Sequence, residues 1–116
     1  MNGFERTAFH WPSTAASKMP QFDVFQAPDG TLVVDCQSDF LSSLPTRYVL
    51  PLYGKSEAEW SFSRLTPQLP FRGQTYYLAT PVGAAIDVED LGPSLGSLSE
   101  HRYTILNALN MLLTGI

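Results

Sequence analysis

The chain has 116 residues, of which 44% are hydrophobic and 16% charged, and its formal net charge is −4. This length fits one domain with a modest core, and nine Pro with eight Gly favour short strands and turns over a helical bundle. The negative charge argues against DNA or RNA as the main ligand and fits a protein partner. One Cys and two His are too few for a metal cluster, so we expect no metal and no cofactor.

Residues 1–18 differ from the rest because they are rich in Ser, Thr and Ala and hold aromatic side chains without a regular spacing. We predict an N-terminal extension here. It is either a flexible arm, or sequence upstream of a start at Met19, or a segment whose aromatics pack on the domain or on a second subunit. It lacks the apolar segment of a signal peptide, and no run in the chain is apolar enough to span a membrane. We therefore expect a cytoplasmic protein whose single domain covers residues 19–116.

The next segment has the pattern of antiparallel strands. Residues 22–26 alternate between apolar and polar side chains, which is typical of a half-buried strand. The turn Ala27-Pro28-Asp29-Gly30 leads into residues 31–36, which are more continuously apolar and therefore predict a more central strand. Within that run we expect Cys36 to be a small core residue and no nucleophile.

Residues 37–45 form a polar loop that carries two adjacent apolar residues, Phe40 and Leu41, at its middle. Beyond it, Pro51 suggests that the following strand ends at an edge or a bulge. A surface loop or helical turn is expected over residues 54–63. The further strands are predicted over residues 47–52, 65–71, 74–80 and 84–88.

The final element is predicted to be an amphipathic helix. Ser99 is a suitable N-cap and Gly115 a suitable stop residue. The stripe expected to face the core consists of Ile105, Leu109, Leu112 and Ile116.

The end of this helix is unusually apolar for a segment with so little sequence after it. An exposed apolar tip is a liability unless it docks on a partner, so we interpret it as a binding surface. The alternative is that Leu113 and Ile116 simply pack on the sheet.

Several blocks of the sequence together resemble the CcdB family of bacterial toxin–antitoxin toxins. They keep the family's order from Met19 onward, whereas residues 55–97 match weakly. The Val-Asp-x-Gln-Ser-Asp segment and the Gly-Ile ending are the most specific features. The matching blocks are Gln21-Phe22, Val34-Asp35-Cys36-Gln37-Ser38-Asp39, Arg47 with Val49-Leu50-Pro51-Leu52, Leu98-Ser99, Arg102, Asn107-Ala108-Leu109-Asn110 and Gly115-Ile116.

The resemblance implies a mainly β (α+β) fold, an SH3-like antiparallel barrel of the CcdB/MazF type with one C-terminal helix, assembled as a homodimer. It also implies a toxin that binds the A subunit of DNA gyrase and traps the enzyme on cut DNA. A cognate CcdA-like antitoxin would neutralise it. The complex would repress its own operon, with operator DNA contacted only through the antitoxin.

The resemblance further implies which residues face gyrase. They are two apolar loop residues and the end of the helix. One departure concerns Thr114, because the best-known members carry Trp at that position and Trp supplies a larger contact. The residues concerned are Phe40, Leu41, Asn110, Leu113, Thr114, Gly115 and Ile116.

Two other functions remain open. A CcdB-like protein without poisoning activity could act as a partner or co-repressor of the antitoxin. A MazF-like endoribonuclease would need converging acid–base groups, and the available candidates form no recognisable motif, so we expect no enzyme. We expect Asp35 and Asp39 to hold loop amides instead. The ribonuclease candidates are Arg47, Arg64, Arg72, His101 and Asp35.

Overall fold

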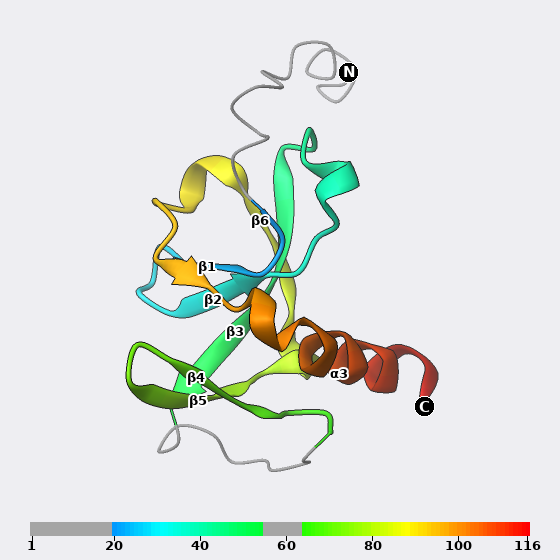
Figure 1. Cartoon of the computed structure of the whole chain (residues 1–116). Helices are drawn as coiled ribbons and strands as arrows, with labels where there is room; N and C mark the ends of the chain where they lie inside the picture. The colour runs from blue at the N-terminus through cyan, green and yellow to red at the C-terminus, as the bar shows by residue number, and fades with distance from the viewer. Residues whose placement is uncertain (1–19, 55–63) are drawn as a thin grey trace.

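The computed structural model describes residues 20–54 and 64–116. The extension predicted over residues 1–18 and most of the loop predicted over residues 54–63 lie outside the described residues. In the described part, short antiparallel strands form one curled sheet, and a single long helix packs across it (Figure 1). The strands are β1 (Asp23–Gln26), β2 (Leu32–Asp35), β3 (Thr46–Gly54), β4 (Gln68–Phe71), β5 (Gln74–Leu78), β6 (Ala84–Asp87) and β7 (Gly96–Ser97).

The sheet is a half-barrel. Its main path runs β4-β5-β3-β2-β1-β7, and β6 pairs with β3 off this path. β4 and β7 therefore stand at the two ends of the path and are not paired with each other. This confirms the predicted mainly β fold with one C-terminal helix.

The β1–β2 hairpin forms as its alternation predicts, with Val24 opposite Val34. Its turn closes with a hydrogen bond from the Ala27 amide to the Thr31 carbonyl, at 2.8 Å. Gly30 has a φ of 92°, the left-handed conformation that glycine adopts without strain. The local turn chemistry therefore fixes the register of the hairpin.

β3 is the longest strand and is shared by three neighbours. Its middle pairs with β2, with Pro51 opposite Val33. Along its other edge it pairs first with β6 and then with β5. The strand continues to Gly54, so the expectation that it ends near Pro51 was wrong. Proline has no amide hydrogen to donate to a neighbouring strand. Pro51 is tolerated because it lies where this edge of β3 changes its partner from β6 to β5, so no hydrogen bond between strands is lost there.

Both faces of the sheet are buried at its centre. The main core lies between the sheet and the helix and includes Val34, Leu50 and Leu78, whereas Phe25 and Val33 belong to a smaller cluster on the opposite face. Cys36 lies in the main core, as predicted, and burial raises the pKa of its thiol to about 12. The thiol is therefore protonated at neutral pH and is a poor nucleophile.

In the described residues the helical elements are four short 3-10 turns and the longer helix α3. The predicted N-cap at Ser99 was wrong, because Ser99 begins the turn η5 and the α-helix proper begins three residues later without a side-chain cap. The predicted stop was right: Gly115 is left-handed, with a φ of 78°, and its amide donates to the Met111 carbonyl. The elements are η2 (Asp39–Leu41), η3 (Thr80–Val82), η4 (Val88–Asp90), η5 (Ser99–His101) and α3 (Arg102–Thr114).

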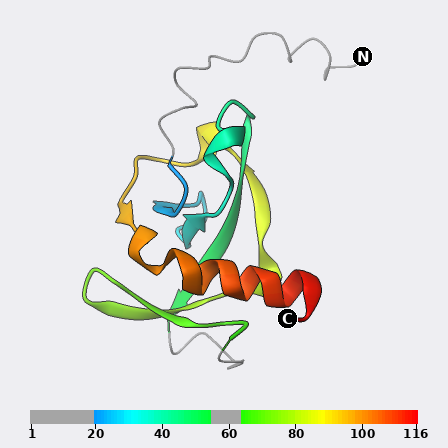
Figure 2. The ribbon, with the colours of Figure 1, turned by 45° about the vertical axis from the view of Figure 1, so that its right-hand side comes forward.

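α3 packs against the main core only as far as the partly buried Leu109. Ile105 and Ala108 are fully buried, but Leu112 is 40% exposed and Ile116 75% exposed. The expectation that Leu112 and Ile116 face the core was therefore wrong. The reason is visible in Figures 1 and 2, where the end of the helix extends past the strands that cover its beginning. No helix in the described residues is long and apolar enough to cross a membrane.

Candidate functional site

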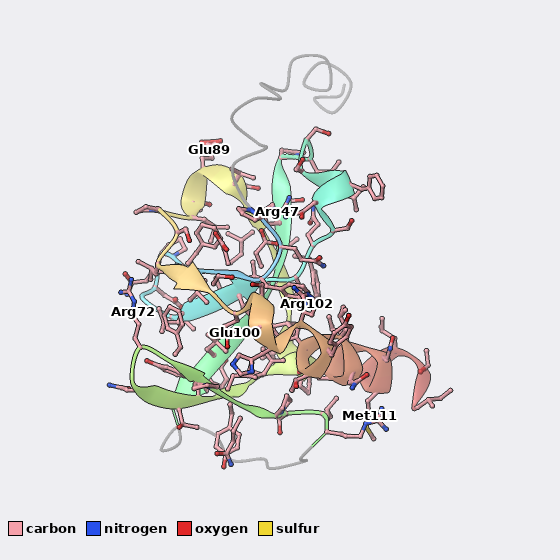
Figure 3. The ribbon with its side chains drawn as sticks, in the orientation of Figure 1. Arg47, Arg72, Glu89, Glu100, Arg102 and Met111 are labelled. Carbon is pink, nitrogen blue, oxygen red and sulfur yellow. The ribbon has the colours of Figure 1, made fainter. Side chains whose placement is uncertain are left out.

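The second half of α3 is an exposed surface without charge. No residue from Tyr103 to Ile116 carries a charged side chain. Leu113 is 76% exposed, and Leu112 is also open to solvent. In Figure 3 the labelled charged side chains lie on other parts of the molecule or at the start of the helix, whereas the label of Met111 stands near its end. An apolar helix end of this kind is suited to protein contact.

Thr114 orders the end of the helix. Its hydroxyl donates to the Asn110 carbonyl at 2.7 Å and accepts a bond from the Ile116 amide at 3.3 Å. One side chain thereby satisfies a carbonyl of the last helical turn and holds the residue that follows Gly115. Thr114 therefore has a structural role that its smaller size relative to Trp does not indicate.

The second candidate surface is the η2 turn. Phe40 is 96% exposed and Leu41 is 46% exposed, so the apolar pair does project from the loop. The turn starts at Ser38, whose hydroxyl accepts a hydrogen bond from the Phe40 amide at 3.1 Å. Asp39 accepts a bond from the Gln21 amide at 2.8 Å, which confirms that its carboxylate holds a backbone amide.

A buried ion pair underlies this turn. The Arg47 Nε and Asp35 Oδ2 atoms are 2.7 Å apart, and both side chains are fully buried. Asp35 also accepts a bond from the Gln37 amide, at 3.0 Å, and Arg47 donates from Nη2 to the Gln37 carbonyl, at 3.1 Å. Burial raises the pKa of the Asp35 carboxyl, while the hydrogen bonds from Arg47 and from the Gln37 amide act against that rise. Asp35 thus holds a loop amide, as predicted.

Gln37 connects the turn to the sheet. Its side-chain oxygen accepts a bond from the Tyr48 amide in β3, at 2.9 Å. Its side-chain nitrogen donates to the Leu41 carbonyl, at 3.1 Å. The Asp, Gln, Ser and Asp side chains of this stretch therefore form hydrogen bonds that shape one exposed turn.

The predicted site residues fall into two separate groups within the chain. Thr114, Gly115 and Ile116 lie at the end of α3, together with Asn110 and Leu113. The η2 turn with its apolar pair lies well apart from that end in both ribbon views (Figures 1 and 2). A single target molecule that touches both groups of one chain must therefore span a considerable surface.

Four of the five ribonuclease candidates fall into two separate pairs. Arg47 and Asp35 are buried against each other and are closed to a substrate. Arg72 and His101 line a pocket of about 370 Å³ between the end of β4 and β7. Arg72 is occupied there, since it donates to the Leu95 carbonyl and lies over the Phe71 ring. Within residues 20–54 and 64–116 no three potential metal ligands gather.

Comparison with known proteins identifies one family. A family model described as CcdB protein matches residues 21–115, which is most of the chain. The matched region contains both candidate surfaces except for Ile116 itself. No curated protein matches the chain. The chain belongs to the CcdB family, and this membership indicates a toxin of a toxin–antitoxin module.

Proposed function

We propose that this protein is a toxin that binds the A subunit of DNA gyrase, traps the enzyme on cleaved DNA and is neutralised by a cognate CcdA-like antitoxin. The observation that carries the proposal is the uncharged, solvent-exposed end of α3. Leu113 and Ile116 present large apolar side chains there with little of the body beneath them. Such side chains gain free energy when a partner removes them from water.

The η2 turn supplies the second contact in this proposal. Phe40 is an aromatic side chain held almost wholly in solvent, and aromatic residues are frequent anchors at interfaces. We assign it and Leu41 to gyrase binding alongside the helix end.

The active form that we propose is a homodimer. Tyr48, Val82 and Leu106 are further exposed apolar side chains that do not belong to either candidate surface. α3 packs on η3, and a Cβ atom placed on Gly83 would come within 2.4 Å of the Tyr48 hydroxyl. These side chains therefore come from neighbouring elements and offer a dimer contact. A dimer would also bring two copies of each candidate surface into one assembly.

We further propose that the protein acts by binding and is no enzyme. The buried state of Arg47 and Asp35 and the engagement of Arg72 support this proposal. The acidic balance of the chain, −4 overall, favours a basic antitoxin segment as its neutralising partner and leaves operator DNA to the antitoxin.

The test is a plasmid cleavage assay. Purified gyrase, supercoiled plasmid, ATP and the protein are incubated, and the reaction is stopped with detergent and protease. We expect linear plasmid in proportion to the protein added. A variant that lacks residues 114–116 should give none, although it should remain folded and lose only several degrees of melting temperature, because these exposed residues contribute the end of the helix and no core contact.

The matched control is Tyr103→Ala. Tyr103 is also a large exposed side chain of α3, but it lies at the beginning of the helix. It should keep full activity. Linear plasmid from the shortened variant at the level of the full chain would refute the role of the helix end. No linear plasmid from the folded, dimeric full chain would refute gyrase poisoning and would favour a non-poisoning partner of the antitoxin, and RNA integrity in expressing cells would then test the MazF-like alternative.

A further inference from the structure

The turn that carries Phe40 keeps this large apolar side chain in water, which is unfavourable for the free protein. A phenylalanine in a flexible loop lowers its free energy by folding back onto apolar surface. Here the side chain is 96% exposed, so the backbone beneath it must be fixed in a conformation that keeps it out. The question is which residue fixes it.

Two hydrogen bonds lie within the turn itself, and Ser38 accepts both of them. The Phe40 amide donates to the Ser38 hydroxyl and the Leu41 amide to the Ser38 carbonyl, at 2.9 Å. These bonds define the shape of the turn but do not attach it to the sheet. On the exit side of the turn, the Gln37 side chain attaches it to the sheet, because it bonds to both the Leu41 carbonyl and the Tyr48 amide.

The backbone of Gln37 is itself held by the buried pair. Its amide donates to Asp35 and its carbonyl accepts from Arg47. Four hydrogen bonds therefore converge on one residue, two through its main chain and two through its side chain. The main-chain bonds come from fully buried groups, which cannot move without disturbing the core.

We propose that Gln37 is a positioning residue that preorganises the Phe40–Leu41 turn for its target, by tying the turn to β3 through its side-chain amide. This inference rests on the proposed function, in that the target is taken to be the gyrase A subunit. Preorganisation improves affinity because the turn need not be ordered when the complex forms. Gln37 itself need not touch the target.

The first measurement is amide hydrogen exchange by NMR on the full chain, which does not involve gyrase. In Gln37→Ala both side-chain bonds are lost, and the amides of Leu41, Ser42 and Tyr48 should exchange about tenfold faster. In Gln37→Glu the side-chain oxygen can still accept from Tyr48 but the donor to Leu41 is gone. There the Leu41 and Ser42 amides should speed up while Tyr48 stays protected.

The matched control is Gln26→Ala. The Gln26 side-chain nitrogen donates to the Gly30 carbonyl at 3.1 Å, a bond of the same length and the same sequence separation as that from Gln37 to Leu41. Its removal should leave exchange in the η2 turn unchanged. The melting temperatures of all three variants should stay near that of the unchanged chain, because neither glutamine is buried.

The second measurement is the affinity for the purified gyrase A subunit. Gln37→Ala should bind roughly fivefold or more weakly, whereas Gln26→Ala should bind as the unchanged chain does. Unchanged exchange of Leu41 and Ser42 in Gln37→Ala would overturn the positioning role. Faster exchange with unchanged affinity would overturn its importance for recognition. If the unchanged chain binds no gyrase A subunit, the proposed function fails, while the exchange result still decides whether Gln37 positions the turn.

Discussion

Replacing Arg47 by Met tests the account of the buried pair most directly. Met has a similar length and suits a core, but it carries no charge. The change removes the 2.7 Å contact with Asp35 and the bond to the Gln37 carbonyl. Asp35 then remains fully buried, and it keeps the hydrogen bond from the Gln37 amide.

The expected loss of stability is large. Removing one partner of a buried ion pair costs about 3–5 kcal/mol, because the other charge stays buried and uncompensated. In a domain of this size the melting temperature should fall by at least about 12 °C. Replacing both partners, as Arg47→Met with Asp35→Leu, should recover part of this loss, since no buried charge remains.

The loss should also depend on pH. Burial already raises the pKa of Asp35, and without Arg47 it should rise further. A carboxyl whose pKa is higher in the folded state stabilises the fold at low pH, and this stability is lost as the pH rises through the folded-state pKa. The deficit of Arg47→Met should therefore be smaller at about pH 5 than at about pH 7.5, by at most about 1.4 kcal/mol for each pH unit.

Urea unfolding of both proteins at the two pH values measures these differences. Arg102→Met is the control, because Arg102 is exposed at the beginning of α3, and it should have little effect at either pH. Equal stability of Arg47→Met and the unchanged chain would refute the reasoning about the pair. A deficit that does not shrink at the lower pH would refute the part assigned to Asp35.

Three further changes have clear expected results. Thr114→Val removes the hydroxyl that bonds Asn110 and Ile116, so gyrase affinity should fall several-fold at unchanged melting temperature, while Thr114→Ser should retain it in the same titration. Gly115→Ala forces a side chain into a left-handed conformation and should cost about 1 kcal/mol in urea unfolding, a loss that would be absent if the helix end readily changed its backbone. Leu50→Ala removes a fully buried side chain from the main core and should cost about 2–5 kcal/mol, and a much smaller loss by the same method would contradict the core assignment.

The features that could be predicted from the sequence are those with a local cause. Side-chain alternation and the turn around Gly30 predicted the first hairpin, and Gly115 predicted the end of the helix. The apolar pair was also recognisable, because Phe40 and Leu41 stand out as apolar residues in an otherwise polar loop, and both are exposed. In each case a few neighbouring residues determine the structure.

The wrong predictions concern features that depend on contacts between residues far apart in the sequence. Helical periodicity correctly assigned Ile105 to the core, but it cannot show where the sheet beneath the helix ends, so it also assigned Ile116 to the core. Arg47 was considered for chemistry because sequence alone does not reveal that Asp35, on the neighbouring strand, neutralises it. The two-residue strand β7 was missed because a strand so short has no periodicity.

The two candidate surfaces share one physical design. Each presents large apolar side chains to solvent. In each, one polar side chain forms a hydrogen bond with the backbone of the same surface: Gln37 with the η2 turn and Thr114 with the end of α3. Exposed apolar groups on ordered backbone lose less conformational entropy on binding than the same groups on mobile loops. Thr114 can therefore support binding without the contact area of a Trp. Its hydrogen bonds lower the conformational entropy that Ile116 loses on binding, and they do not change the area that is buried. If this view is right, Thr114→Trp should add contact area but release Ile116, and its effect on gyrase affinity should be smaller than the added area alone predicts.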